Sequence, residues 1–160
     1  MEFIRVESGN FELIEKVYSI LAAAGAYMLE KFGLTHWVPP YGKDKIAEDT
    51  ENKQVYLVKN ENDFIATFTL SDKTIHVFEA SPDESAMYLS KFAVHPGIMK
   101  SGVGSACIRY IEELCRQTNK TKLRFDVYIK SEHAIKFYLK MGYKEVPSPS
   151  PIVLCMEKIL

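Results

Sequence analysis

Val94-His95-Pro96-Gly97-Ile98-Met99-Lys100-Ser101-Gly102-Val103-Gly104 joins an apolar strand to a strongly amphipathic helix, and this junction is the clearest indication of the fold in the chain. Apolar residues at helical spacing predict this helix: Val103, Ala106, Cys107, Tyr110, Ile111, Leu114 and Cys115. Gly102 and Gly104 then lie at its first turn, where backbone N–H groups have no partner inside the helix. With the positive end of the helix dipole, these groups predict an anion site that suits a phosphate. The alternative is an ordinary strand-to-helix turn in which glycine only supplies the backbone angles.

The composition limits the classes of partner. The chain has 160 residues, with 20 basic and 21 acidic side chains and a net charge of -1. This length suits one domain with its own core, which we expect over 1–160. A near-neutral protein has no overall field that attracts nucleic acid or an anionic membrane, so neither partner is expected. The first residues lack a signal-peptide pattern and the apolar run 20–29 is too short to cross a bilayer, which predicts a soluble, cytoplasmic protein.

Cysteine and histidine form no recognisable metal or disulfide pattern. Cys107, Cys115 and Cys155 are odd in number and lack Cys-x-x-Cys spacing, so reduced thiols are expected. The four histidines are scattered, with no His-x-x-x-His pair. We therefore expect no metal site.

The first half of the chain predicts two helices and an antiparallel meander. Residues 3–7 have the pattern of a strand, and Asn10 can cap a long helix that ends at Gly33. The segment 34–40 contains two consecutive prolines and cannot be regular helix, whereas 42–52 is expected to be a short polar helix. Strands are predicted at 54–59, 64–70 and 74–78.

The second half predicts a crossover unit of strand, helix and strand. The strand 87–94 precedes the glycine turn, and 122–128 alternates apolar and polar residues after the amphipathic helix. These two strands are expected to be parallel, with a right-handed connection. A second helix begins after Ser131, a suitable cap, and stops at Gly142. Two further strands, 143–146 and 152–158, complete the sheet on either side of a Pro-Ser-Pro-Ser-Pro loop.

The order of these elements, the segment 94–104 and the run Leu123-Arg124-Phe125-Asp126-Val127-Tyr128 resemble the GCN5-related N-acetyltransferase (GNAT) family over nearly the whole chain. The family's acyl-CoA motif is Arg or Gln, two residues, Gly, one residue, then Gly or Ala. It falls on Met99-Lys100-Ser101-Gly102-Val103-Gly104, where both glycines match and Met99 does not. Lys100 and Ser131 stand where the family often has Gly and Asn. The resemblance implies an α/β (α+β) fold: a mixed, mostly antiparallel central sheet, helices on both faces and a splayed parallel strand pair.

The resemblance also implies acetyl-CoA as the cosubstrate. Backbone N–H groups from Met99 to Gly104 would hold the pyrophosphate, with Lys100 adding charge, and the strand from Phe92 to Val94 would pair with the pantetheine arm. The implied binding residues are Phe92, Ala93, Val94, Met99, Lys100, Ser101, Gly102, Val103, Gly104, Ser105, Ser131, Ala134, Phe137 and Tyr138.

The family's chemistry is direct transfer of an acyl group from the thioester to an amine through a tetrahedral oxyanion. A backbone N–H near Ala93 or Val94 is the expected oxyanion donor. Tyr138 occupies the position that the family often uses as the acid for the departing thiolate. The alternative role for Tyr138 is a core tyrosine packed with Phe137 and Met141.

The base is expected among the carboxylates that precede the strand 87–94. Glu79, Asp83 and Glu84 lie in this acidic loop and could take the amine proton directly or through water. The alternative is an ordinary solvated loop. His95 is a weaker candidate for the base because it lies on the phosphate side of the strand, and we expect it to be a turn residue.

The acceptor is expected to be a primary amine of a small molecule or peptide. Trp37 and Tyr41 flank the Pro-Pro turn, which would overhang the acceptor site in this fold, and aromatic walls with nearby acidic residues favour a cationic amine. Alternatively, Trp37 anchors the long first helix against the sheet.

The leading interpretation is therefore an acetyl-CoA-dependent N-acetyltransferase. Dimers are frequent in the family, so a homodimer is a further hypothesis. A non-catalytic acyl-CoA-binding or protein-interaction module is the alternative, because Met99 and Lys100 depart from the motif. A dinucleotide or nucleoside triphosphate site is disfavoured, since no Gly-x-Gly-x-x-Gly is present.

Overall fold

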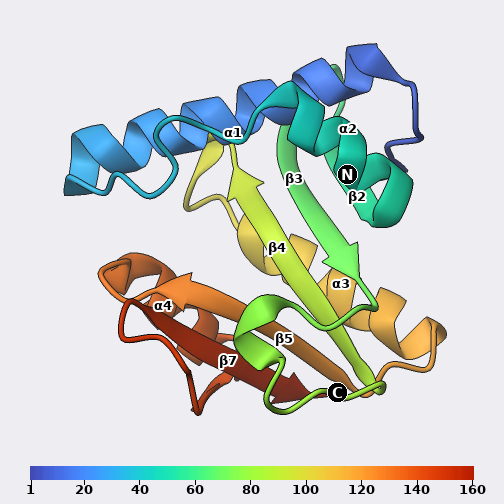
Figure 1. Cartoon of the computed structure of the whole chain (residues 1–160). Helices are drawn as coiled ribbons and strands as arrows, with labels where there is room; N and C mark the ends of the chain where they lie inside the picture. Colours follow the sequence, from blue (N-terminus) through green and yellow to red (C-terminus); the bar gives the residue numbers. More distant parts are fainter. The chain divides into compact units, whose positions relative to one another are not determined.

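The computed structural model describes residues 1–160 and contains one mixed sheet of seven strands (Figure 1). Hydrogen-bonded neighbours follow the order β1-β2-β3-β4-β5-β7-β6, with β4 and β5 parallel, which confirms the predicted fold class. The elements are β1 Glu2–Arg5, α1 Phe11–Phe32, α2 Lys43–Asn52, β2 Gln54–Asn60, β3 Asp63–Ser71, η1 His76–Phe78, β4 Ala86–Val94, η2 Pro96–Ile98, α3 Val103–Gln117, β5 Lys122–Tyr128, α4 Glu132–Lys140, β6 Lys144–Val146 and β7 Val153–Ile159.

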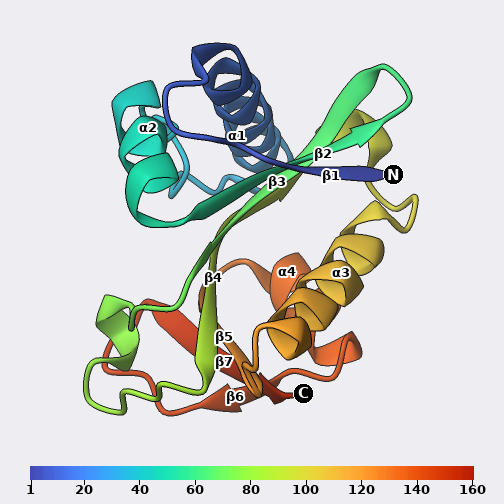
Figure 2. The ribbon, with the colours of Figure 1, turned by 90° about the vertical axis from the view of Figure 1, so that its right-hand side faces the viewer.

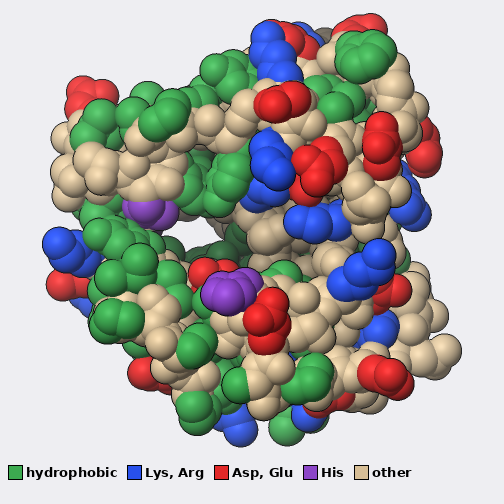
Figure 3. All heavy atoms as spheres, viewed as in Figure 1, with side chains coloured by type: hydrophobic (Ala, Val, Ile, Leu, Met, Phe, Trp, Pro, Cys, Tyr) green, Lys and Arg blue, Asp and Glu red, His purple; other side chains and the backbone are tan.

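The chain forms two compact units. The first comprises Met1–Leu70 with Lys91–Gly104, and the second comprises Ser71–Ser90 with Ser105–Leu160. In the first unit β1, β2 and β3 form an antiparallel meander, in which β2 and β3 match two of the three predicted meander strands and β1 takes the place of the third; Figure 2 shows α1 and α2 on the same face of it. Acidic and basic side chains are interspersed over α2 (Figure 3), where Lys43 pairs with Glu15 of α1 at 2.6 Å.

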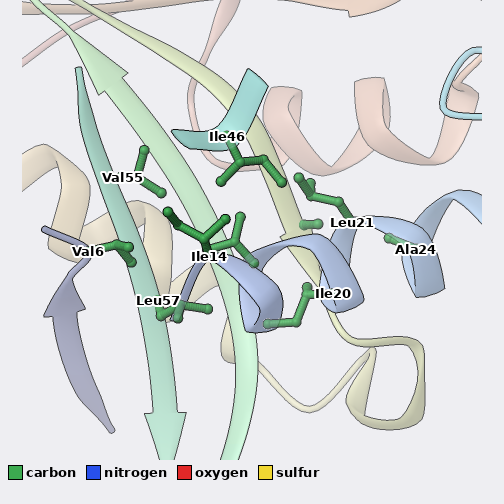
Figure 4. Close-up of a cluster of buried hydrophobic side chains, with 10 residues drawn as sticks. Val6, Ile14, Ile20, Leu21, Ala24, Ile46, Val55 and Leu57 are labelled. Carbon is green, nitrogen blue, oxygen red and sulfur yellow. The ribbon is translucent and has the colours of Figure 1, made fainter. Parts of the chain in front are cut away.

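The core of the first unit lies between this face of the meander and the two helices. Figure 4 shows strand side chains and helix side chains pointing toward one another across this layer. Burying each such aliphatic side chain contributes about 1.5–3 kcal/mol, so the amphipathic pattern of α1 fixes which face it presents. The cluster consists of Val6, Ile14, Val17, Ile20, Leu21, Ala24, Ile46, Val55, Leu57 and Ala93.

Both predicted ends of α1 are confirmed. The Asn10 side chain accepts a hydrogen bond from the Leu13 N–H at 3.2 Å, as an N-cap does. Gly33 ends the helix in the left-handed conformation, with φ of 68°. Its N–H donates to the Leu29 carbonyl at 2.9 Å, so the chain leaves the helix at this residue.

In the second unit, strands that include β5 and β7 form a layer that is covered on both faces. The first part of β4 pairs with β5 in parallel over Ala86–Tyr88, and β7 pairs with β5 and β6 in antiparallel register. Figures 1 and 2 show α3 and α4 on one face of these strands and η1 on the other. Leu89 and Ser90 continue β4 without a partner on β5 in this register, so the parallel pair is short.

The strand predicted at 74–78 is wrong, because this segment contains the 3-10 turn η1. Phe78 belongs to a buried cluster with Ala86, Tyr88 and Cys155. Three partly buried side chains pack against this cluster: Ile75, Val77 and Val146. In a strand the adjacent residues Val77 and Phe78 would point to opposite faces, whereas a tight turn lets both cover the same face of the sheet.

Candidate active site

The glycine turn between β4 and α3 contains two residues with a left-handed backbone conformation. Lys100 has φ of 64° and Gly102 has φ of 86°. Gly102 immediately precedes α3 and Gly104 lies in its first turn, as predicted. A side-chain Cβ at Gly102 would meet no atom within 4 Å, so a ligand can approach the backbone here. The left-handed angle at Lys100 is one that glycine adopts without strain.

Local hydrogen bonds hold the first part of this turn. The Nδ1 atom of His95 accepts from the Gly97 N–H at 3.1 Å, which is the turn role expected for this histidine. The Met99 N–H donates to the Pro96 carbonyl at 3.4 Å, and the Ser101 hydroxyl donates to the Ile98 carbonyl. The N–H groups of the first turn of α3 have no acceptor inside the helix, so this end of the turn has the donors that an anion site needs.

The end of β4 presents a second set of backbone donors. The His95 N–H donates to the Ile65 carbonyl of β3 at 2.8 Å. Because successive N–H groups of a strand point to opposite edges, the Val94 N–H points away from β3. Of the two N–H groups expected as oxyanion donors, that of Val94 therefore lies on the edge away from β3.

Ser131 lies at the start of α4, but its side chain does not cap the helix. This part of the prediction is wrong: the Ser131 carbonyl accepts from the Ile135 N–H at 3.0 Å, whereas its hydroxyl makes no cap bond. The side chain is 3% exposed and its hydroxyl has no hydrogen-bond partner in the protein. An unpaired buried hydroxyl costs about 1–3 kcal/mol, so a polar ligand atom placed here would recover this cost.

Tyr138 is half-buried on α4 within a group of aromatic rings. Its ring centroid lies 4.3 Å from that of Phe125, 5.1 Å from Phe137 and 6.0 Å from Tyr143. Burial raises the pKa of the Tyr138 hydroxyl above its usual value, so the group stays protonated at neutral pH. No side chain of α4 is fully buried, which leaves Ala134, Phe137 and Tyr138 available for contact with a ligand.

A buried carboxylate is hydrogen-bonded to one tyrosine of this aromatic group. Glu112 of α3 accepts hydrogen bonds from the Tyr143 hydroxyl at 2.9 Å and from the Lys158 ammonium at 2.8 Å. The Lys158 ammonium also donates to the Met141 carbonyl at 2.9 Å, at the end of α4. This network fixes Tyr143, whose ring touches Phe125 with centroids 5.0 Å apart.

The three carboxylates of the acidic loop have different surroundings. Asp83 pairs with Lys122 at 2.5 Å and accepts from the Ser85 N–H at 2.9 Å. These partners, Lys122 first, hold the pKa of Asp83 well below its usual range, which is the pattern of a structural ion pair. Glu79 is exposed, 3.4 Å from the His76 Nδ1 atom, and Glu84 is exposed. These two side chains are accessible to solvent just before β4 begins.

Trp37 packs against the core of the first unit. It is half-buried on that cluster, and a Cβ placed at Gly25 of α1 would lie 2.5 Å from the Trp37 carbonyl oxygen. This close approach supports the alternative in which Trp37 anchors α1. Tyr41 is 40% exposed, with its ring centroid 6.3 Å from that of Trp37.

One further contact could not be predicted from the sequence, an ion pair between Asp49 of α2 and Lys91 of β4. The two residues are 42 positions apart and belong to no recognisable motif. The three cysteines are buried and unbridged. No group of three or more His, Cys, Asp or Glu side chains could hold a metal ion, and no helix is both long and apolar enough to span a bilayer.

Several known proteins share this fold. The PaiA N-acetyltransferase of Thermoplasma acidophilum, solved in complex with coenzyme A, is 15% identical with a TM-score of 0.76 over 100% of both chains. The ribosomal-protein-S18-alanine N-acetyltransferase of Escherichia coli is 15% identical with a TM-score of 0.72, over 99% of this chain and 92% of that chain. The GNAT domain of S. lividans PAT is 16% identical with a TM-score of 0.76, over 99% and 89%. No curated protein sequence matches significantly.

The family itself is shown by the sequence. The sequence model of the Acetyltransferase (GNAT) family matches residues 15–143, which is most of the chain and includes the glycine turn and Tyr138. The chain therefore belongs to the acetyltransferase (GNAT) family, enzymes that take their acetyl group from acetyl-CoA.

Proposed function

We propose that this protein transfers an acetyl group from acetyl-CoA to a primary amine of a small molecule or peptide by direct attack, as one GNAT domain over residues 1–160. The single observation that carries the proposal is the turn before α3. Its left-handed Gly102 leaves the backbone open to a ligand, and α3, whose first N–H groups have no acceptor inside the helix, begins at the next residue.

The proposed contacts to acetyl-CoA come from three elements. Backbone N–H groups from Lys100 to Gly104 bind the pyrophosphate, and Met99 and Ser105 flank them; the Met99 N–H is left out of the expected set because it donates to the Pro96 carbonyl. Phe92 and Val94 of β4 supply main-chain hydrogen bonds to the pantetheine arm, beside Ala93. On α4, the unpaired hydroxyl of Ser131 and the half-buried side chains of Ala134, Phe137 and Tyr138 complete the set.

The proposed reaction needs three groups of this chain. A carboxylate, Glu79 or Glu84, takes a proton from the ammonium form of the acceptor, directly or through water. The amine nitrogen bonds to the thioester carbonyl carbon while the Val94 N–H stabilises the negative oxygen. The carbon–sulfur bond then breaks and Tyr138, which is protonated at neutral pH, donates to the departing thiolate, while the second proton lost by the amide nitrogen passes through solvent and restores the Tyr138 hydroxyl.

The names of two structural neighbours suggest which acceptors to try. Both the Escherichia coli protein and a protein from Brucella melitensis are ribosomal-protein-alanine N-acetyltransferases by name. A panel of acceptors should therefore contain peptides with a free N-terminal alanine beside small cationic amines and free amino acids.

The test is thiol release from acetyl-CoA with this panel, for the unaltered protein and for Tyr138→Phe. Turnover with at least one primary amine is expected, and Tyr138→Phe should lower kcat by roughly ten- to a thousandfold without changing the Kd for acetyl-CoA. Tyr27→Phe, on the half-buried face of α1, is the matched control and should retain full activity.

Three results separate the alternatives. Binding of acetyl-CoA without turnover for any acceptor would favour a non-catalytic acyl-CoA-binding module. Equal kcat for Tyr138→Phe and the unaltered protein would remove Tyr138 from the mechanism. Full activity in both Glu79→Gln and Glu84→Gln would place the base elsewhere.

A further inference from the structure

Lys91 has an unusual conformation for a residue within a strand. It lies in β4 with φ of 51°, in the left-handed region that a lysine adopts only at a cost in free energy. It is also the first residue of the β4 segment that belongs to the first unit, three positions before Val94. A glycine at this position would make the same backbone turn without the cost.

The contacts of the Lys91 side chain explain why this position carries a lysine. Its ammonium is paired with the Oδ2 atom of Asp49 in α2, and the two side chains are only 12% and 9% exposed. The same ammonium lies 4.7 Å from the centre of the Tyr41 ring. Lys53, at the end of α2, binds the other carboxylate oxygen of Asp49 at 3.1 Å. Asp49 thus joins two lysines, of which only Lys91 belongs to the sheet.

Two costs are combined at this residue, a left-handed backbone and a buried charge. Backbone strain of this kind persists only where surrounding contacts over-determine it, and it is concentrated at functional sites. A buried ion pair is also weak evidence for stability by itself, because desolvation offsets the attraction between the charges. The pair is therefore better explained by what it fixes: it ties a defined backbone angle in β4 to α2.

We propose that Asp49 and Lys91 are positioning residues that hold the end of β4 so that the Val94 N–H faces the edge away from β3. This inference rests on the proposed function, in which that N–H stabilises the oxyanion and the same strand pairs with pantetheine. Neither side chain touches the reacting atoms. Their effect passes through the backbone from Lys91 to Val94, where a misplacement of about 1 Å can lower a rate by roughly a hundredfold.

The test compares three single substitutions that each remove a charge, with Lys91→Arg as a fourth that keeps it. Lys91→Met removes the ammonium and keeps most of the side chain, and Asp49→Asn removes the charge and keeps the size of its partner. Lys53→Met is the matched control, because it removes the other lysine from the same carboxylate without touching β4. Each variant is measured for kcat, for KM toward acetyl-CoA, and for amide hydrogen exchange in peptides that contain Phe92 to Val94.

Lys91→Met and Asp49→Asn are expected to lower kcat at least tenfold and to speed amide exchange at the end of β4, with the larger change in kcat than in KM. Lys53→Met is expected to stay within about twofold of the unaltered protein in both measurements. Lys91→Arg, which keeps the charge, should retain most of the kcat of the unaltered protein. If Lys91→Met does not fold, Asp49→Asn and Lys91→Arg make the same comparison with Lys53→Met.

Equal effects of Lys91→Met and Lys53→Met, or unchanged exchange at the end of β4, would overturn the proposal. The exchange measurement needs no turnover, so it separates the two ideas. An unaltered protein that acetylates nothing would refute the proposed function, whereas the exchange comparison would still decide whether Asp49 and Lys91 hold β4.

Discussion

Replacing Gly102 by alanine separates the two interpretations of the glycine turn. The residue has φ of 86°, and an added Cβ would meet no protein atom within 4 Å. The substitution therefore introduces backbone strain without a clash. A left-handed alanine costs about 1–2 kcal/mol, which corresponds to a fall in the thermal midpoint of about 2–8 °C for a chain of this size.

The same substitution should have a larger effect on ligand binding. The new methyl group would occupy the space through which a phosphate reaches the N–H groups at the start of α3. Losing one hydrogen bond to a charged group costs about 1.5–3 kcal/mol, so the Kd for acetyl-CoA should rise about 10- to 100-fold. Proteins of this kind have about 5–15 kcal/mol of stability, so the variant stays folded during the titration.

Gly9 provides the matched control. It has φ of 81°, and a Cβ there would also meet no atom within 4 Å, but it lies before α1 and outside every proposed contact. Gly9→Ala should lower the thermal midpoint about as much as Gly102→Ala, as measured by scanning calorimetry, and leave the calorimetric Kd for acetyl-CoA unchanged. Equal affinity of Gly102→Ala and the unaltered protein would refute the assignment of the turn as the phosphate site.

Three further predictions concern stability. Lys100→Gly removes the left-handed strain at φ of 64°, part of which is offset by the greater freedom of glycine in the unfolded chain, and should raise the thermal midpoint by about 1–4 °C; a lower midpoint would contradict this. Burial raises the pKa of Cys107 to about 12, so the folded state keeps a proton that the unfolded chain loses above about pH 9, and stability falls as the pH rises. Cys107→Ala should therefore reduce the fall in unfolding free energy between about pH 8 and about pH 10 by roughly 1.4 kcal/mol in urea titrations, and an unchanged pH dependence would disprove this. Glu112→Ala leaves a buried tyrosine hydroxyl and a lysine ammonium without their acceptor and should cost about 3 kcal/mol in the same assay, against less than about 0.5 kcal/mol for the exposed Glu113→Ala; similar costs would count against the network.

The elements that sequence predicted correctly are those set by local chemistry. The apolar stripe of α1 and the caps at Asn10 and Gly33 act within a few residues of each other, so they can be recognised without the rest of the fold. The same holds for the turn before α3, where Gly102 needs a left-handed angle. These signals, with the family resemblance, were enough to identify the fold and one candidate site.

The features that sequence missed depend on distant contacts. The segment 74–78 alternates like a strand, but Val77 and Phe78 both cover one cluster of the second unit, which only the packed structure reveals. Ser131 has the right side chain for a cap, yet its hydroxyl is buried without a partner. The pair of Asp49 and Lys91 joins residues 42 positions apart, and nothing local to either one indicates the other.

The structure also explains one departure from the family motif. Lys100 stands where related proteins often have glycine, and its φ of 64° shows that the turn needs a left-handed residue here. The backbone therefore forms the same turn at a cost of about 1–2 kcal/mol. Since the proposed pyrophosphate contacts are backbone N–H groups, this departure and the one at Met99 alter side chains and leave those donors in place.

Calorimetric titration of the purified protein with acetyl-CoA, with 3′-dephospho-CoA and ATP as comparators, shows whether the turn before α3 is a phosphate site. We expect saturable binding of acetyl-CoA that ATP does not reproduce, and weaker binding by Gly102→Ala. Absence of binding at millimolar acetyl-CoA would mean that the turn before α3 forms no phosphate site.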